Sequence, residues 1–186
     1  TLKEELNVDD VEEKWTWFRQ ILEALEHIHE AGIIHLDLKP NNIFLDGTSN
    51  IKVGDFGLAE FFESDSAHPA DTTEVSSDDT QQNKQAVQQN KQAVVCLYTA
   101  PEIDKGWAKI DDKADMYSLG LIFFELFHPF KTESEKIDTL SSLKRGGVLP
   151  TAWVAEFPKH ASLLRKLISP DPSKRPSAAE LLNNAS

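Results

Sequence analysis

His35-Leu36-Asp37-Leu38-Lys39-Pro40-Asn41-Asn42 is the stretch on which the predicted fold rests, together with Asp55-Phe56-Gly57 a short way along the chain. Two β-prone runs, 43–45 and 51–53, lie between these stretches and are separated by Asp46-Gly47-Thr48-Ser49-Asn50. This pattern predicts a β-hairpin with a loop of five residues. A hairpin returns the chain to its starting point, so the two stretches should meet at its open end.

Four polar side chains therefore converge on one small site: Asp37, Lys39, Asn42 and Asp55. Carboxylate and amide oxygens suit Mg²⁺, which usually takes one or two carboxylates together with substrate phosphates. A further carboxylate beside bound Mg²⁺ and phosphate is what a phosphoryl-transfer site needs to orient a hydroxyl nucleophile. The spacing thus indicates Mg²⁺-dependent phosphoryl transfer.

Four motifs in this order resemble those of the protein kinases. The opening stretch is similar to the catalytic loop H-R-D-L-K-P-x-N, and Asp55-Phe56-Gly57 to D-F-G. Ala100-Pro101-Glu102 matches A-P-E, and residues 115–120 match a D-x-x-S-x-G pattern. The alternative, a hairpin between helices with a structural aspartate, is disfavoured by four motifs in the right order. The resemblance implies a mainly α (α+β) fold, a kinase C-terminal lobe with one small hairpin.

The resemblance also assigns roles in a reaction that uses ATP and Mg²⁺. Asp37 would accept the proton of the substrate hydroxyl, and Lys39 would hold the γ-phosphate. Asn42 and Asp55 would ligate Mg²⁺. These four residues are the expected catalytic and cofactor-binding set.

Four other matching residues are expected to hold the fold rather than take part in chemistry. By the resemblance, His35 anchors the catalytic loop and Asp115 braces it. Glu102 and Arg175 would form a buried ion pair, which is costly to break from one side.

Two further stretches narrow the resemblance. Residues 115–126 with His128-Pro129-Phe130 resemble the kinases that phosphorylate the alpha subunit of translation initiation factor 2. Residues 149–158 and 161–165 are similar to the general control non-derepressible kinases of that group, which sense amino-acid starvation. The implied activity is transfer of the ATP γ-phosphate to a serine of that subunit. The helix starting at Thr132 would dock this substrate.

Several positions depart from the family pattern. Leu36 stands where kinases regulated by loop phosphorylation carry an arginine that pairs with the phosphate. Val94-Val95 stand where the family has Gly-Thr, and Ser134 and Lys136 replace the usual Met and Arg of the docking helix. A pseudokinase acting as an interaction module is therefore a second hypothesis. A degraded gene product without function is a third.

Composition sets the broad class. The chain has 186 residues, a formal net charge of −12 and a single cysteine, Cys96. One cysteine excludes an internal disulfide framework and indicates a reducing, cytoplasmic setting. The acidic charge disfavours direct nucleic-acid binding, and no apolar run is long enough to span a membrane.

The organisation predicts a partial kinase domain over residues 1–186. No glycine-rich loop and no strand lysine precede the catalytic stretch, and these parts cover the ATP phosphates in the family. We therefore expect the small lobe to be absent and the isolated chain to be catalytically silent. Residues 60–95 are predicted to be a low-complexity insertion in the activation loop, with one heptad repeated as 81–87 and 88–94. A homodimer would form through regions outside this segment.

Periodicity and capping residues predict the helices. They are expected from Asp9 or Asp10 to Glu30, over 113–127, from Thr132, over 160–168 and from Ser177. Residues 150–158 are predicted to be a loop. His27 and His29 are interpreted as surface or helix-end histidines.

Overall fold

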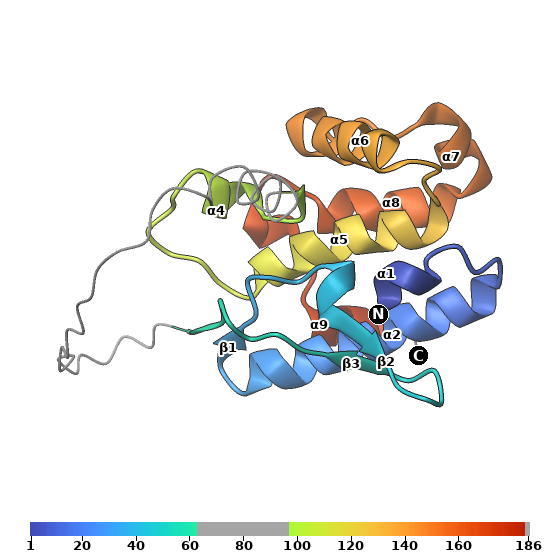
Figure 1. Cartoon of the computed structure of the whole chain (residues 1–186). Helices are drawn as coiled ribbons and strands as arrows, with labels where there is room; N and C mark the ends of the chain where they lie inside the picture. The colour runs from blue at the N-terminus through green and yellow to red at the C-terminus, as the bar shows by residue number, and fades with distance from the viewer. Residues whose placement is uncertain (63–96, 185–186) are drawn as a thin grey trace, which may run out of the picture.

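The computed structural model describes residues 1–62 and 97–184 (Figure 1). This part is mainly helical, with two antiparallel sheets of two strands each, which confirms the predicted fold class. Its helices are α1 (Leu2–Glu5), α2 (Val11–Glu30), α4 (Pro101–Asp104), α5 (Lys113–Phe127), α6 (Glu133–Gly146), α7 (Thr151–Glu156), α8 (Pro158–Leu167) and α9 (Ala178–Asn184), with 3₁₀ turns η1 (Pro40–Asn42) and η2 (Pro172–Lys174). Its strands are β1 (Ile33–Ile34), β2 (Ile43–Leu45), β3 (Ile51–Val53) and β4 (Glu60–Phe61).

Helix α5 forms the centre of the core. All fourteen residues that follow Lys113 in this helix, Ala114 to Phe127, are buried, and most of them are apolar. A helix with apolar side chains on every side is stable only when it is buried inside the fold. In Figure 1 it runs through the middle of the molecule with α8 beside it, and α6 and α7 lie to one side.

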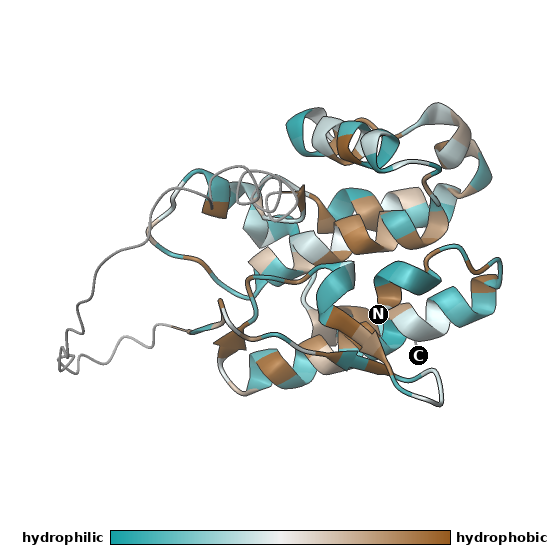
Figure 2. Ribbon diagram, in the orientation of Figure 1, coloured by the Kyte–Doolittle hydropathy of each residue, from teal (hydrophilic) through white to brown (hydrophobic). Residues whose placement is uncertain are grey.

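Helix α2 covers the other side of the core and ends where the catalytic stretch begins. Asp10 caps it by accepting hydrogen bonds from the backbone N–H groups of Glu12 and Glu13 at 2.9 and 3.2 Å. Its end is marked by Gly32, whose φ of 75° suits a residue without a Cβ atom. Brown and teal residues alternate along α2 in Figure 2, as expected for a helix with one buried face.

The hairpin of β2 and β3 has the predicted five-residue loop. Its register pairs Ile43 with Val53 and Leu45 with Ile51. The Asp46 carboxylate holds the loop by accepting hydrogen bonds from Thr48 and Asn50. These hydrogen bonds, led by the one from the Thr48 hydroxyl, lower the pKa of Asp46 to about 2.

The loop predicted over residues 150–158 is wrong, because α7 forms there. The Trp153 ring is buried, and its Nε1 donates a hydrogen bond to Phe127 O at 3.0 Å. This long-range contact favours a helix where the local pattern, between two prolines, did not indicate one. Helix α8 also begins at Pro158 rather than His160, since proline is well suited to the first helical position.

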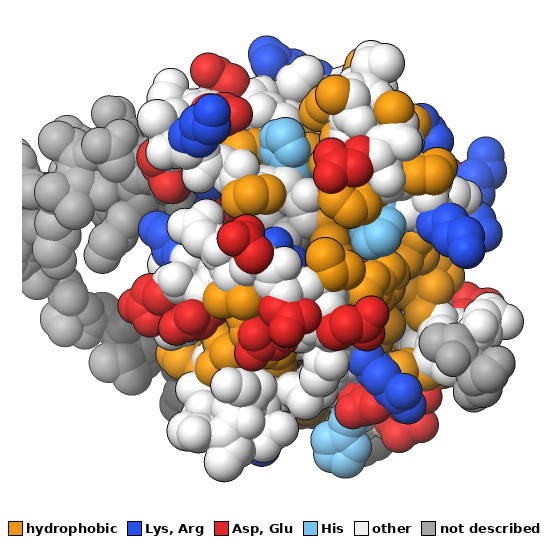
Figure 3. Space-filling model, turned by 90° about the vertical axis from the view of Figure 1, so that its right-hand side faces the viewer, with side chains coloured by type: hydrophobic (Ala, Val, Ile, Leu, Met, Phe, Trp, Pro, Cys, Tyr) orange, Lys and Arg blue, Asp and Glu red, His pale blue; other side chains and the backbone are white. Residues whose placement is uncertain are grey.

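Three sequence features fall largely outside the described residues. The low-complexity insertion lies there from residue 63 onward, as do its repeated heptads and Val94-Val95. Within residues 1–62 and 97–184, no helix is long and apolar enough to cross a membrane. Acidic side chains are spread over the face shown in Figure 3, in line with the net charge of −12.

Candidate functional site

Asp37, Lys39 and Asn42 are in direct contact on the loop that leads into the hairpin. Asp37 Oδ1 lies 3.0 Å from Lys39 Nζ. Asn42 Nδ2 donates to Asp37 O at 2.7 Å and to Asp37 Oδ2 at 3.0 Å. Both carboxylate oxygens of Asp37 therefore have a donor, which fixes their orientation. Both amide hydrogens of Asn42 are used, so its amide oxygen is the part of the side chain that can ligate a cation.

Asp55 is placed beside this group by the open end of the hairpin. Gly54 N donates to Asn42 O at 2.9 Å, so Asp55 directly follows the residue that pairs with Asn42. Asp55 has a φ of 56°, and its Oδ1 accepts a hydrogen bond from Gly57 N at 3.3 Å. A left-handed conformation at a residue with a side chain costs about 1–3 kcal/mol and is typical of functional sites.

His35 connects the catalytic stretch to this second stretch. Its ring is buried, and its Nε2 lies 2.8 Å from Gly54 O while its Nδ1 accepts the Asp37 N–H at 3.2 Å. A carbonyl oxygen can only accept, so Nε2 is the donor to Gly54 O, while Nδ1 is the acceptor for the Asp37 N–H. The ring also packs on Phe56 with centroids 4.9 Å apart. With both nitrogens occupied, His35 is suited to positioning rather than to proton transfer.

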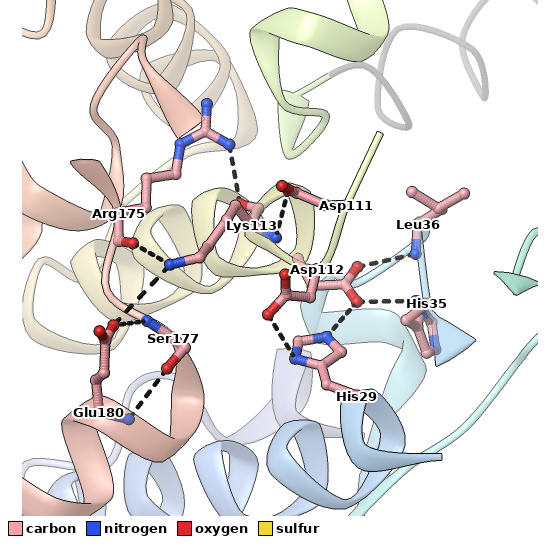
Figure 4. Close-up of polar contacts among 10 residues, drawn as sticks. His29, His35, Leu36, Asp111, Asp112, Lys113, Arg175, Ser177 and Glu180 are labelled. Carbon is pink, nitrogen blue, oxygen red and sulfur yellow. Dashed lines mark hydrogen bonds and ion pairs between the residues drawn. The ribbon is translucent and has the colours of Figure 1, made fainter. Parts of the chain in front are cut away.

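Asp115, at the start of α5, holds the backbone just before Asp37. Its Oδ2 accepts the His35 N–H at 2.8 Å and its Oδ1 accepts the Leu36 N–H at 2.9 Å (Figure 4). Leu36 has a φ of 64°, a conformation that a leucine adopts only when its surroundings impose it. The two hydrogen bonds that the backbone donates to this fully buried carboxylate provide that restraint.

His29 supplies a third donor to Asp115. It lies in the last turn of α2, as the helix-end alternative predicted, but the surface alternative is wrong. Its Nε2 lies 2.8 Å from Asp115 Oδ2, and its side chain is only 8% exposed. Its Nδ1 faces Asp112 Oδ2 at 3.8 Å, and burial raises the pKa of the Asp112 carboxyl group. No local signal could reveal this contact, because Asp115 is far along the chain from α2.

Replacing His29 with alanine should lower the free energy of unfolding by about 1–3 kcal/mol, because a buried carboxylate loses a donor. His27→Ala is the matched control, since His27 is exposed two residues earlier on the same helix. A surface change of this kind is expected to alter stability by less than about 0.5 kcal/mol. Urea unfolding of both variants measures the difference. Equal effects would show that the bond to Asp115 contributes nothing.

Glu102 and Arg175 form the expected buried pair. Arg175 Nη1 and Nη2 donate to Glu102 Oε1 and Oε2 at 2.6 and 2.8 Å, and both residues are at most 2% exposed. Arg175 also donates to Lys113 O at 2.9 Å and to Ser169 O at 2.8 Å. Its guanidinium lies over the Tyr117 ring at 4.9 Å. Four groups, the Glu102 carboxylate, two backbone carbonyls and the Tyr117 ring, are thus joined at one arginine.

Lys136, which replaces the usual residue of the predicted docking helix, points into the protein instead of outward. Its Nζ lies 2.6 Å from Glu125 Oε1, and the Tyr98 hydroxyl donates to Glu125 Oε2. Burial, followed by the charge of Glu125, raises the pKa of Tyr98 well above its ordinary value, so the hydroxyl keeps its hydrogen. Lys136 therefore joins α6 to α5 rather than presenting a charge to a substrate. Ser134, in contrast, is exposed on α6.

The donor set at the hairpin suits Mg²⁺. Asn42 and Asp55 offer one amide oxygen and one carboxylate, both hard ligands. Within the described part of the chain, no three His, Cys, Asp or Glu side chains gather as a metal site. Mg²⁺ does not require such a cluster, because it keeps several waters and takes phosphate oxygens from its substrate.

Comparison with known proteins supports the reading of these motifs. The protein kinase domain family matches residues 2–185. The chain is 50% identical over 187 residues to the eIF-2-alpha kinase GCN2 of Arabidopsis thaliana, covering 98% of this chain and 14% of that protein. It is 39% identical over 185 residues to the human eIF-2-alpha kinase GCN2, covering 91% of this chain and 10% of that protein. A probable serine/threonine-protein kinase of Dictyostelium discoideum, ifkB, is 36% identical over 192 residues, with 93% and 14% covered. The chain thus spans about a seventh or less of the length of these relatives.

Proposed function

This chain belongs to the protein kinase family, and from that premise we propose that it is the catalytic lobe of a kinase acting on translation initiation factor 2. The reaction would transfer the γ-phosphate of ATP to a serine of the alpha subunit, under amino-acid starvation. The observation that carries the proposal is the contact of Asp37 with both Lys39 and Asn42, at 3.0 Å in each case. These contacts hold one carboxylate in a fixed orientation at the open end of the hairpin.

The proposed roles follow from this geometry. Asp37 accepts the proton of the substrate hydroxyl, because Lys39 and Asn42 hold its carboxylate in a fixed orientation. Lys39 Nζ, a cation with three donors, holds the γ-phosphate beside it. Asn42 and Asp55 ligate Mg²⁺ through oxygen atoms. When bound, ATP would supply the phosphoryl group, and Mg²⁺ would neutralise the charge that develops on it.

The residues proposed to position the site are buried. Asp115 holds the backbone of residues 35 and 36, and His35 ties the catalytic loop to Gly54. The ion pair joins α4, which contains Glu102, to Arg175 directly after η2. We propose that these four residues preserve the site without touching the substrate.

The domain proposal is that residues 1–186 form part of a kinase domain, with residues 60–95 as an insertion in its activation loop. The parts that cover ATP in kinases, a glycine-rich loop and a strand lysine, are not among these motifs. The isolated chain is therefore expected to need a small lobe for activity.

The substrate proposal rests on the names of the relatives. Proteins called eIF-2-alpha kinase in plants, mammals and fission yeast are 38–50% identical to this chain over nearly its whole length. Residues that select the substrate would have to lie on the outward side of α6, because Lys136 is committed to Glu125.

The proposal is tested by joining a family small lobe to this chain and measuring phosphate transfer from ATP to the recombinant alpha subunit. Transfer that depends on Mg²⁺ is the expected result. A pseudokinase is the second candidate, favoured by Leu36, which cannot pair with a loop phosphate. Silence of the joined protein, with activity restored by Leu36→Arg and Val95→Thr, would place the defect at these two departures from the family pattern. Silence of both proteins would overturn the proposed enzyme.

A further inference from the structure

A hollow that includes no residue of the catalytic stretch lies beside α5. It lies between the segment that follows α4, the end of α6 and the end of α8, and its volume is about 490 Å³. Its floor is apolar, formed by Tyr117, Leu143 and Ile168, which are all largely buried. Ligand sites in proteins typically measure about 300–1,000 Å³ and combine an apolar floor with a few polar groups.

The rim of this hollow is basic, although the chain is acidic. Four charged side chains line it, and all are cationic: Lys105, Lys144, Arg145 and Arg165. The chain as a whole has 31 acidic and 19 basic residues, so a lining without a carboxylate is a local reversal of sign. Lys144 pairs with Asp104 at 2.9 Å. Within residues 1–62 and 97–184, no ion pair involves the other three cations.

Stabilisation of helix ends does not account for this arrangement. Basic residues favour the C-terminal turn of a helix, and Arg145 and Arg165 do lie in the last turns of α6 and α8. Lys166, however, occupies the same turn as Arg165 and does not line the hollow. Lys105 comes from a third element, and the ends of α6 and α8 already have backbone donors in Gly147 and Ile168. The cations converge on the hollow from three separate segments.

We propose that this hollow docks an acidic peptide segment of a partner protein, with an apolar side chain of that segment on the floor. Charge complementarity identifies the partner, because the rim presents three cations without an ion pair around apolar residues. Inorganic phosphate would leave the apolar floor uncovered. A nucleic acid would meet the repulsion of the acidic remainder of the surface. The site is separate from Asp37 and so does not depend on the proposed phosphoryl transfer.

The test measures binding of a fluorescein-labelled peptide, glutamates around a central phenylalanine, to the full 186-residue chain by anisotropy. The double variant Arg145→Glu and Arg165→Glu should weaken binding by about tenfold or more, equivalent to about 1.4 kcal/mol. Lys159→Glu with Lys166→Glu is the matched control, since both lysines are exposed on α8 and outside the hollow. The control should leave binding within about twofold of the parent chain. Replacing the central phenylalanine of the peptide with serine should also weaken binding.

Each outcome decides the proposal. Absence of binding would overturn it. An equal loss in the two double variants would also overturn it, because the loss of binding would then reflect net charge alone. Full competition by inorganic phosphate would also overturn it, since the site would then be an anion site and not a peptide site. Thermal unfolding checks that the variants fold. Arg145→Gln with Arg165→Gln provides the same comparison, with a smaller charge change, should the reversed charges prevent folding.

Discussion

Replacing Glu102 with leucine should lower the free energy of unfolding by about 3–5 kcal/mol, because it leaves a buried guanidinium without its counter-charge. Arg175 is 1% exposed, so water cannot compensate for the lost carboxylate. A domain of this size is stable by about 5–15 kcal/mol in total, and the change removes a large part of that. Urea unfolding followed by circular dichroism measures the loss.

Arg175→Met tests the other side of the same pair. It also removes the donors to Lys113 O and Ser169 O, so its loss at neutral pH should be at least as large. A buried carboxyl group that has lost its cation can take up a proton, whereas a guanidinium cannot lose one. The deficit of Arg175→Met should therefore shrink as the pH falls, and that of Glu102→Leu should not.

The double variant Glu102→Leu with Arg175→Met separates pairing from packing. If the charges depend on each other, the double variant loses less stability than the sum of the single ones, by about 0.5–3 kcal/mol. Strict additivity would show that the two residues stabilise the fold independently, contrary to the bidentate geometry at 2.6 and 2.8 Å.

The elements that could be predicted from the sequence are those specified by local signals. Helix α5 has the bounds expected from its continuous apolar run. Helix α2 begins after a capping aspartate and ends before Gly32. The hairpin follows from two β-prone runs and a turn-rich loop, and it brings Asn42 and Gly54 together as expected. Each of these elements is specified by residues that lie close together in the sequence.

The parts that could not be predicted depend on contacts between distant segments. His29 belongs to the site through Asp115, and Lys136 is turned inward by Glu125. Helix α7 forms because Trp153 is buried against the end of α5. Motif matching placed Glu102 with Arg175, but the two carbonyl groups that share this arginine have no sequence signature. Long-range polar partners are a property of the packing, and a local pattern carries no information about them.

Asp37→Asn should lower kcat for phosphate transfer by about 100- to 10,000-fold in the chain joined to a small lobe, the range expected for loss of a general base. Asparagine has nearly the same shape, but its amide cannot accept the hydroxyl proton. It also places an NH₂ donor where Asp37 has one of its two carboxylate oxygens, and so removes the acceptor that faces either Lys39 or Asn42.

The kinetic constants distinguish a chemical role from a structural one. If Asp37 accepts the proton, kcat falls while KM for ATP stays within about threefold, because Lys39 and the Mg²⁺ ligands remain. Asp46→Asn is the matched control, since it removes a carboxylate from the hairpin loop, away from the site. It should leave kcat unchanged. A large rise in KM with little change in kcat for Asp37→Asn would show that this carboxylate shapes the site but takes no proton, and would move the search for the base to another residue.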